Sequence, residues 1–246
     1  MRSDMLLHYT ETGYLIILPH DDPRLIVDAM LQTGYSEEFC VALDFSPAFI
    51  ARLMQAGFLV MSSGIDDRGD DGEEGDSLPP YILLPKLHLI RSALFFDNLH
   101  VKKSIKRHLG NYELRFDSDF DRIVDRCLAI HGDGWLTPPL VDAIRCIRRD
   151  RLCGVYPVSF ALYRGGELVA GEFGVLAGRV YTSYSGYYDE SNSGTVQMIL
   201  VTRFLQKNGF AFFDLGMPLD YKTDLGAVDI SPQEFVTRFR GAQLPA

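Results

Sequence analysis

The sequence predicts a mixed α/β fold of the α+β kind, with a largely antiparallel sheet that follows a small helical N-terminal unit. Two observations predict this class. Alternating apolar and polar residues over 157–164 and 167–176 flank a Gly-Gly pair, which is typical of a tight β-hairpin. A third alternating stretch, 180–185, is followed by helically spaced apolar residues over 193–207 and a short apolar run at 210–213. The order strand, strand, strand, helix, strand, helix results.

Composition limits the classes of function that the chain can serve. Its 246 residues form one large domain or two small ones, and 47% hydrophobic residues suffice for a substantial core. A net charge of −9 argues against a uniformly basic nucleic-acid coat but allows a local basic patch. The four cysteines show no metal-ligand spacing, and no signal peptide or membrane-spanning run is evident. We therefore expect a reduced, cytoplasmic, soluble protein, favoured as a monomer, with no metal and no membrane contact.

Residues 1–90 are predicted to form the small N-terminal unit. The apolar run 14–18 predicts a strand. Helices are predicted from Pro23 to Gly34 and from Ser46-Pro47 to Gly57, because proline suits a first helical turn and glycine a helix end. A further short helical stretch is predicted to open at 36–38.

An acidic stretch, residues 64–77, separates this unit from the following strands. It holds seven acidic residues, one basic residue and a single apolar one, so burial cannot offset its ordering entropy. We predict a mobile surface loop there, since its acidic positions match a calcium loop poorly. The second predicted domain covers residues 91–246.

A concentrated basic segment occupies residues 99–108 of this acidic chain. Its four cationic side chains are Lys102, Lys103, Lys106 and Arg107. Taken alone, such a run favours a solvated helix face. The alternative is a phosphate-binding patch, because lysine and arginine provide most sequence-independent affinity for nucleic acids.

Two further residues between 112 and 214 are candidates for function. Trp135, the one tryptophan, sits in a glycine-rich turn between predicted helices over 117–128 and 137–149. A lone tryptophan is more often a core anchor than a stacking platform. Asp214 follows the apolar run 210–213, where a carboxylate either performs chemistry or caps the next loop, and the pattern leaves both open.

The predicted element order is that of the second half of the N-acetyltransferase-like acyltransferase fold. Enzymes of that fold which use acetyl-CoA hold its pyrophosphate with Q/R-x-x-G-x-G/A before the central helix. Residues 189–194 read DESNSG at that position and would repel a pyrophosphate. Coenzyme A is therefore disfavoured.

From Leu99 onward the sequence resembles the leucyl/phenylalanyl-tRNA–protein transferases. Residues 99–107, LHVKKSIKR, are similar to the family's LHVSRSLRR, and Gly134-Trp135 occupies its TW turn. Residues 166–171, GELVAG, match the family hairpin. The family ending GFxLIDCQ…LGA is similar to residues 209–214 together with Leu225-Gly226-Ala227. The order and spacing of these motifs make the resemblance specific over roughly 150 residues.

The resemblance implies transfer of Leu or Phe, or a similar apolar amino acid, from aminoacyl-tRNA to the N-terminal amine of a protein, which tags it for degradation. Because the aminoacyl ester is already activated, no CoA, ATP or metal is required. The four basic side chains would contact acceptor-stem phosphates, and Trp135 would pack on the terminal adenosine. The resemblance also implies an apolar pocket for the transferred side chain.

The departures from the family concern its polar groups. Tyr184 stands where the family's FGESMFS strand has Glu, Gly216 replaces the Gln of DCQ, and Tyr221 replaces a His. Tyrosine has an ordinary pKa near 10 and is a poor base at neutral pH. We expect Asp214 to orient the amine, with Tyr184 or Ser185 completing the hydrogen bonding.

Tyr187 and Tyr221 are the remaining predicted substrate-binding residues. Four acidic residues would suit a basic acceptor N-terminus at the mouth of the site. They are Glu172, Asp189, Glu190 and Asp220. Two other functions stay open: a tRNA- or peptide-binding protein on the same fold that has lost turnover, and an N-acyltransferase with another acyl donor.

Overall fold

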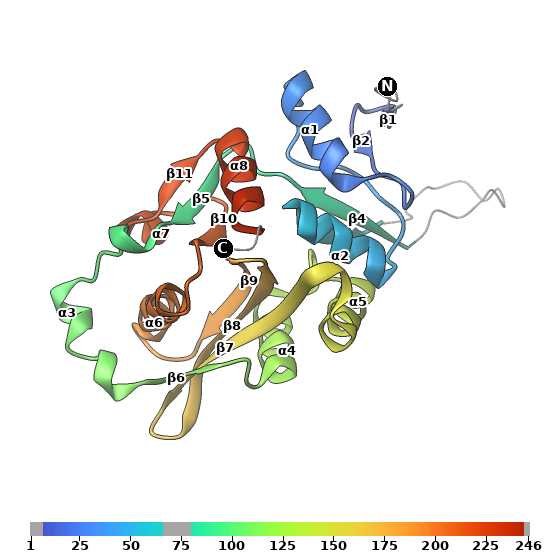
Figure 1. Cartoon of the computed structure of the whole chain (residues 1–246). Helices are drawn as coiled ribbons and strands as arrows, with labels where there is room; N and C mark the ends of the chain where they lie inside the picture. The colour runs from blue at the N-terminus through green and yellow to red at the C-terminus, as the bar shows by residue number, and fades with distance from the viewer. Residues whose placement is uncertain (1–6, 66–79, 244–246) are drawn as a thin grey trace.

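The computed structural model describes residues 7–65 and 80–243, so the predicted acidic loop lies almost entirely outside the described residues. A seven-stranded mixed sheet forms the centre of the molecule, in the order β11-β5-β10-β9-β8-β7-β6 (Figure 1). The strands are β5 (Arg91–Leu94), β6 (Glu113–Phe116), β7 (Val155–Arg164), β8 (Glu167–Ala177), β9 (Val180–Tyr188), β10 (Phe212–Gly216) and β11 (Val228–Ile230). Neighbouring strands are antiparallel except β9 and β10, which are parallel. The predicted mixed, largely antiparallel sheet is thus confirmed.

The three long strands form the predicted meander. Arg164 pairs with Glu167 across a two-residue turn, in which Gly165 and Gly166 both have positive φ, 58° and 89°. Such a turn matches the right-handed twist of the two strands, and glycine adopts it without steric cost. The Gly-Gly prediction is confirmed.

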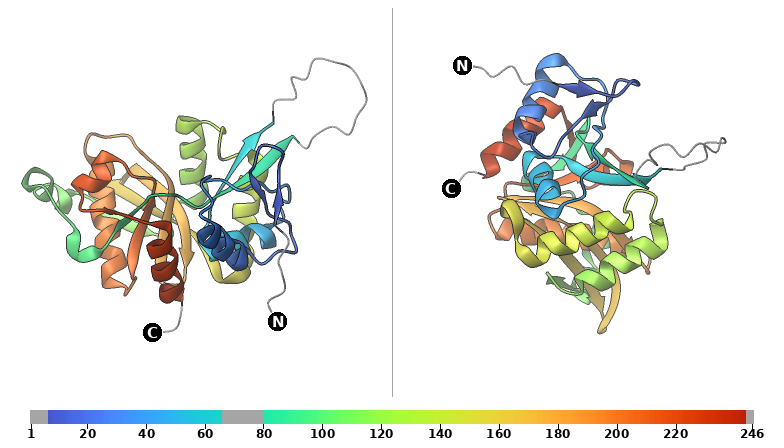
Figure 2. Two further views of the ribbon diagram at one scale, coloured as in Figure 1. Left: turned by 90° about the horizontal axis from the view of Figure 1, so that it is seen from above. Right: turned by 90° about the vertical axis from the view of Figure 1, so that its right-hand side faces the viewer.

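Helices cover both faces of the sheet. Helices α4 (Phe120–His131) and α5 (Pro138–Asp150) lie side by side on one face, and α6 (Ser193–Lys207) lies on the other (Figures 1 and 2). The α6 helix is the crossover that a parallel β9–β10 pair requires. The C-terminal helix α8 (Pro232–Gln243) packs Phe235 and Phe239 into the core near β10.

The N-terminal unit contains two small sheets and two helices. They are β1 (His8–Tyr9), β2 (Leu15–Ile16), α1 (Pro23–Thr33), α2 (Pro47–Ala56), β3 (Leu59–Gly64) and β4 (Tyr81–Lys86). Gly34 and Gly57 end the two helices in the left-handed conformation, as predicted. The predicted helix at 36–38 is wrong. Phe39 and Ala42 bridge to β4, and Glu38 pairs with Lys86 at 2.7 Å, so this stretch is extended.

Short elements link strands of the central sheet at the side of the molecule opposite the N-terminal unit (Figure 1). They are the 3₁₀ turns η1 (Phe96–Asn98) and η2 (Leu109–Asn111), with α3 (Lys103–Lys106) between them, and α7 (Asp220–Asp224) after β10. A third turn, η3 (Leu152–Gly154), leads from α5 into β7. The basic segment therefore holds a single helical turn rather than a long helix.

Strand β9 contains a bulge that the alternation of the sequence does not reveal. Phe173 of β8 pairs with Ser185, but Gly174 pairs with Ser183, so Tyr184 is an extra residue. A bulge changes which face the following side chains occupy. Tyr181 accordingly packs on the α6 side of the sheet, whereas Tyr187, six residues later, packs on the α4 side.

One apolar core crosses the predicted boundary at residues 90/91. It joins Leu15 and Phe49 of the N-terminal unit to Ile144 of α5 and Phe239 of α8. The α6 face of the sheet carries a separate core around Tyr181 and Phe213. The predicted division into two domains stays a prediction.

Candidate active site

A cavity of about 600 Å³ opens where the parallel strands β9 and β10 part. These strands pair only from Val180 with Phe212 to Thr182 with Asp214, and beyond that point each continues separately. Polar, glycine and tyrosine residues of β8, β9, α6 and α7 form most of the wall. The described lining is His131, Gly171, Glu172, Ser183, Tyr184, Ser185, Gly186, Tyr187, Tyr188, Ser191, Asn192, Gly194, Thr195, Gln197, Met198, Leu215, Tyr221 and Lys222.

The position of this cavity follows from the topology. In sheets with parallel strands, a crevice forms beyond their carboxyl ends when neighbouring connections leave in different directions. Here β9 continues into α6 on one face, and β10 continues through Met217 toward α7. The cavity therefore lies at the one parallel pair of the described sheet.

A second cavity, of about 220 Å³, lies between the first and the basic segment. Asn192, Thr195 and Tyr221 line both cavities. The remaining wall of the second cavity includes His100 and Lys102. The two cavities therefore adjoin at these three residues, and the pair is called the groove below.

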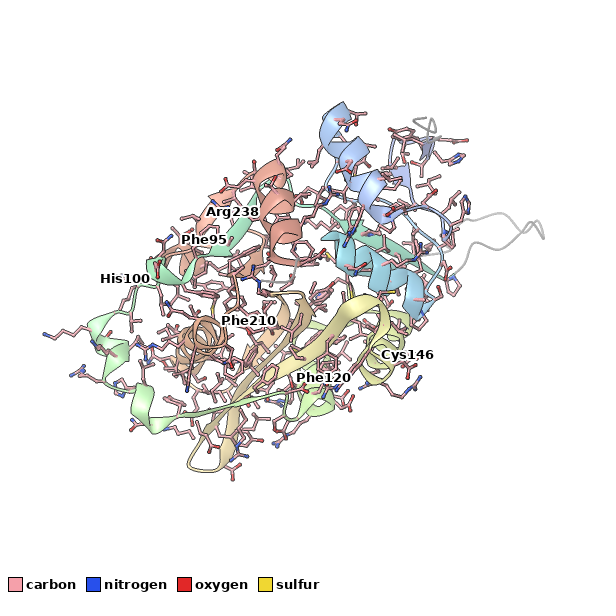
Figure 3. All side chains as sticks on the ribbon, in the orientation of Figure 1. Phe95, His100, Phe120, Cys146, Phe210 and Arg238 are labelled. Atoms are coloured by element: carbon pink, nitrogen blue, oxygen red, sulfur yellow. The ribbon has the colours of Figure 1, made fainter. Side chains whose placement is uncertain are left out.

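The basic segment is held in place by the motif Leu225-Gly226-Ala227. The amide of His100 donates a hydrogen bond to the carbonyl oxygen of Leu225 at 2.9 Å, and His100 lies near η1 at the outer side of the sheet (Figure 3). Lys102 pairs with the exposed carboxylate of Asp224 at 2.5 Å. Lys103, Lys106 and Arg107 are exposed. Of the four cations, Lys102 therefore lines the second cavity, and the other three lie exposed next to it in the chain.

Two charged side chains are buried in the wall of the main cavity. Glu172 of β8 is 6% exposed, and its Oε1 has no hydrogen-bond partner among residues 7–65 and 80–243. Its Oε2 lies 3.5 Å from the Ser183 hydroxyl, at the limit of a hydrogen bond. Burial raises the pKa of Glu172 to about 7, and the Tyr181 and Ser183 hydroxyls and the Lys222 ammonium limit that rise.

Lys222 of α7 is the second buried charged side chain in the cavity wall. Its Nζ donates hydrogen bonds to the carbonyl oxygens of Leu215 at 2.6 Å and Met217 at 2.8 Å. Burial lowers the pKa of Lys222 to about 8, while the carboxylates of Asp214 and Glu172 oppose the change. The cavity therefore holds a carboxylate and an ammonium, and it is not the purely apolar pocket that the resemblance implies.

The predicted catalytic Asp214 lies inside β10 rather than at its end, and its side chain does not line the cavity. Arg91 donates to both carboxylate oxygens, at 2.9 Å from Nε and 2.5 Å from Nη2. Thr182 and the amide of Gly216 also donate to them. Burial raises the pKa of Asp214, but Arg91 and these donors outweigh burial and hold it below its usual range.

Arg91 is equally enclosed, and no motif around it predicted its role. Its guanidinium lies over the Phe235 ring at 3.9 Å and donates to the carbonyl oxygen of Gly57. The ion pair joins β5 and β10 to α8 and the end of α2. We interpret Asp214 as a residue that supports the sheet beside the cavity and does not contact a ligand in it.

Tyr184, the bulged residue, lines the cavity, but its hydroxyl is already engaged. It accepts a hydrogen bond from the amide of Val60 at 3.1 Å. Burial raises the pKa of Tyr184 above its ordinary value, so this phenol is an even poorer base than an exposed tyrosine. Its observed contact is with the N-terminal unit.

Replacing Tyr184 by Phe is expected to lower the free energy of unfolding by about 1–3 kcal/mol, because the buried Val60 amide loses its partner. Urea unfolding measures the change. Tyr188→Phe is the matched control, since that side chain is 66% exposed and its hydroxyl bonds to no described residue. Equal stabilities of both variants would contradict the contact.

The other predicted site residues divide into two groups. Ser185, Tyr187 and Tyr221 line the main cavity, and Tyr221 also lines the second one. Trp135 lines neither. Its carbonyl oxygen accepts a hydrogen bond from the amide of Ser62, which places Trp135 beside β3. The structure thus does not bring Trp135 to the basic segment.

The four predicted acidic residues are also separated. Glu172 is in the cavity wall rather than at its mouth. Asp189 pairs with Arg126, and Glu190 pairs with Arg164 at 2.9 Å. Asp220 is exposed in the first turn of α7. Only Glu172 of these four lines the cavity among the described residues.

Sequence reasoning missed Lys222 and His131 as cavity residues. His131 Nε2 lies 2.9 Å from the carbonyl oxygen of Gly186, at the opposite wall. A lysine between a tyrosine and a threonine carries no distinctive spacing, but its position one residue after Tyr221, itself a predicted site residue, was an available signal.

Within 7–65 and 80–243, His, Cys, Asp and Glu form no group of three or more that could hold a metal ion. In the same residues, no helix has the length and apolar character needed to cross a membrane.

The segment that holds both cavities matches a known family. A sequence model of the family described as leucyl/phenylalanyl-tRNA protein transferase matches residues 93–240. The chain belongs to this family. All residues that line the two cavities lie inside the matched segment.

Curated relatives carry the same family name. The leucyl/phenylalanyl-tRNA–protein transferase of Pseudomonas putida (strain W619) is 33% identical over 150 residues, and that of Pseudomonas entomophila (strain L48) is 31% identical over 154 residues. Each alignment covers 59% of this chain and 65% of the relative. The match therefore spans somewhat less than two thirds of these relatives.

Solved structures were compared as well. L-PGS from Bacillus licheniformis has a TM-score of 0.44 and 12% identity, with 97% of this chain and 89% of that chain covered. A conserved protein of unknown function from Staphylococcus epidermidis ATCC 12228 has a TM-score of 0.39 and 7% identity, with 89% and 81% covered.

Within the leucyl/phenylalanyl-tRNA–protein transferase family, the structure gives the shared motifs a physical role. The LGA motif holds the basic segment, the GELVAG hairpin carries β8 into the cavity wall, and the aspartate of β10 anchors Arg91. Of the three positions predicted to depart from the family motifs, Tyr184 and Tyr221 line the main cavity, and Gly216 follows the lining residue Leu215 in β10.

Proposed function

We propose that this protein transfers an aminoacyl group from aminoacyl-tRNA to the N-terminal amine of a protein, and so marks that protein for degradation. The family relationship supports this reaction. The transferred residue is Leu, Phe or a similar amino acid, and the acceptor is a protein or peptide N-terminus. An aminoacyl ester is activated, so the proposed reaction uses the charged tRNA as co-substrate and requires no CoA, ATP or metal.

The observation that carries the proposal is the groove, the two adjoining cavities between the basic segment and the gap between β9 and β10. A tRNA acceptor end needs cations for its phosphates and a recess for the attached amino acid. Lys102 and His100 line one end of the groove, and Glu172 and Lys222 lie at the other. A ribose ester placed near Tyr221 would sit between the two.

The side chains have distinct proposed roles. Lys102, Lys103, Lys106 and Arg107 bind acceptor-stem phosphates. Tyr187, Tyr221 and Ser185 form part of the recess for the aminoacyl group. Trp135 is the proposed contact for the terminal adenosine. This contact requires the 3′ end of the tRNA to reach β3, because Trp135 lies beside that strand.

We further propose that residues 91–246 form an N-acetyltransferase-like acyltransferase domain, with residues 1–90 as a smaller unit packed on it. The split between parallel strands β9 and β10, with α6 as the crossover, supports that fold. We propose a cytoplasmic location, since charged tRNA and nascent proteins meet in that compartment. We also propose that the protein is a monomer.

A transfer assay read by mass spectrometry tests the function. The protein is mixed with a pool of charged tRNAs and with peptides that begin with Arg, Lys, Met, Asp or Glu. A mass increase on one class of peptide identifies donor and acceptor together. Binding of tRNA without product would favour a binding protein that has lost turnover. Product from an acyl-CoA pool alone would favour an N-acyltransferase with another donor.

The basic segment is expected to make tRNA binding steeply dependent on salt. Four phosphate contacts predict a slope of log K against log salt of roughly −3. Lys103→Gln with Lys106→Gln should reduce the slope by about 1.5–2, as measured by filter binding or fluorescence anisotropy. Lys207→Gln at the exposed end of α6 is the control and should leave it unchanged. An unchanged slope in the double variant would remove this segment from the tRNA site.

A further inference from the structure

The proposed reaction requires a group that accepts a proton from the attacking amine, and the structure narrows the choice. Asp214 is surrounded by Arg91, Thr182 and Gly216 and lies outside the cavity wall. The Tyr184 hydroxyl accepts a bond from Val60. Among the described lining residues, Glu172 is the one carboxylate, and its Oε1 is buried without a partner.

We propose that Glu172 is the proton acceptor of this site: its carboxylate takes the proton of the attacking N-terminal amine in the cavity between β9 and β10. This inference rests on the proposed aminoacyl transfer and extends it. A buried carboxylate oxygen without a partner carries a large desolvation cost, which a donor on the ligand would remove. An incoming amine supplies such a donor.

The chemistry balances without a further reactant. The amine nitrogen forms the new C–N bond to the ester carbonyl carbon while its proton passes to the Glu172 carboxylate. The C–O bond to the ribose then breaks, and the departing ribose oxygen takes the proton from Glu172. The products are the amide and a tRNA with a free hydroxyl, and Glu172 is again a carboxylate.

The groups around Glu172 suit this cycle. Tyr181 and Ser183 face it from β9, Lys222 and Tyr221 from α7, and Cys127 from α4. Of these, the Tyr181 and Ser183 hydroxyls and the Lys222 ammonium favour the charged carboxylate, whereas burial opposes the charge. Burial raises the pKa of Glu172 and these three groups lower it, with a net value of about 7. That value is close to the pH at which a general base works best.

The test compares the full-length protein with Glu172→Gln, which keeps the shape of the side chain but cannot accept the proton. Glu167→Gln is the matched control, because Glu167 is the exposed first residue of the same strand. Transfer from charged tRNA to a peptide is measured as kcat/KM between pH 5.5 and 9. Binding of charged tRNA and thermal unfolding are measured on the same samples.

We expect Glu172→Gln to lower kcat/KM by about 100-fold or more, with tRNA binding and Tm retained. The unaltered protein should gain activity as the pH rises through about 7, where Glu172 loses its proton. The α-amine of the peptide titrates separately at about 7.7–8.0. Glu172→Gln should keep the rise in activity caused by the α-amine and lose the rise near pH 7. Glu167→Gln should keep both rises.

A structural role for Glu172 predicts something different. Two results would overturn the proposal and leave the transfer function intact. One is a loss of kcat/KM of less than tenfold in Glu172→Gln, and the other is a pH profile of this variant that still rises near pH 7. Carbon-13 NMR of labelled glutamate gives a second measurement, independent of activity. The signal lost in Glu172→Gln should titrate near pH 7, and titration near 4.5 would also overturn it. No product from the unaltered protein at any pH would instead overturn the transfer function itself.

Discussion

Replacing Asp214 by Asn is expected to lower the free energy of unfolding by about 3–5 kcal/mol, the largest loss of stability among single polar substitutions in this protein. Arg91 and Asp214 are 1% and 0% exposed, so the remaining guanidinium would be a buried charge without a counter-charge. Urea unfolding, followed by circular dichroism, measures the loss. Asp229→Asn in the exposed strand β11 is the control and should change little.

The double variant Arg91→Met with Asp214→Leu separates the cost of an unpaired charge from the value of the pair. It removes both charges, and we expect it to lose less stability than Asp214→Asn alone.

The ion pair between Arg91 and Asp214 also predicts that the free energy of unfolding depends on pH. Because the pKa of Asp214 is lowered in the folded state, its contribution is present above its ordinary pKa of 3.8 and is lost as the pH falls toward the folded value. If Asp214→Asn proved as stable as the unaltered protein, the ion pair would not support the sheet.

Replacing Gly226 by Ala is expected to lower the free energy of unfolding by about 3 kcal/mol or more. A Cβ at this position would lie 1.9 Å from the carbonyl oxygen of Asn98, and the backbone has φ of +98°. The clash is with backbone, so no side-chain rotation relieves it. Thermal and urea unfolding both measure the effect.

Gly209→Ala provides the control for the backbone conformation alone. Gly209 also has a positive φ, +74°, but a Cβ there would meet nothing within 4 Å. It should cost only about 1–2 kcal/mol. Since Asn98 leads directly into His100 and the basic segment, Gly226→Ala should in addition weaken tRNA binding, and Gly209→Ala should not. Equal losses in both variants would show that the close approach to Asn98 contributes nothing.

The sequence was sufficient to predict the elements whose signal is local. The hairpin at Gly165-Gly166, the helix from Pro23 to Gly34 and the crossover helix α6 all depend on residues close together in the chain. The short strand β11 and the one-turn helix α7 escaped because three to five residues are too few to show a period. The basic segment was predicted correctly as a cluster of charge but not in its short helical form.

The candidate site could be predicted only in part. The resemblance identified the strand and loop that form the cavity, including Ser185, Tyr187 and Tyr221. It could not show that Asp214 is enclosed, because its partner Arg91 lies 123 residues away in the chain. Whether Glu172 meets solvent, core or cavity depends on how far β9 and β10 separate, and that distance follows from tertiary packing.

The extra residue in β9 has a consequence for how this chain can change over time. Insertions or deletions of one residue at the Gly165-Gly166 turn alter a hairpin end that projects from the sheet. Loss of Tyr184 would restore regular pairing with β8 and leave Ser185 and Tyr187 opposite Phe173 and Gly171, so the later side chains would keep their faces. What would be lost is the hydroxyl that accepts a hydrogen bond from the Val60 amide. Homologous chains should therefore vary in length at the hairpin, and a chain that lacks the extra residue of β9 should keep the same partners between β8 and β9.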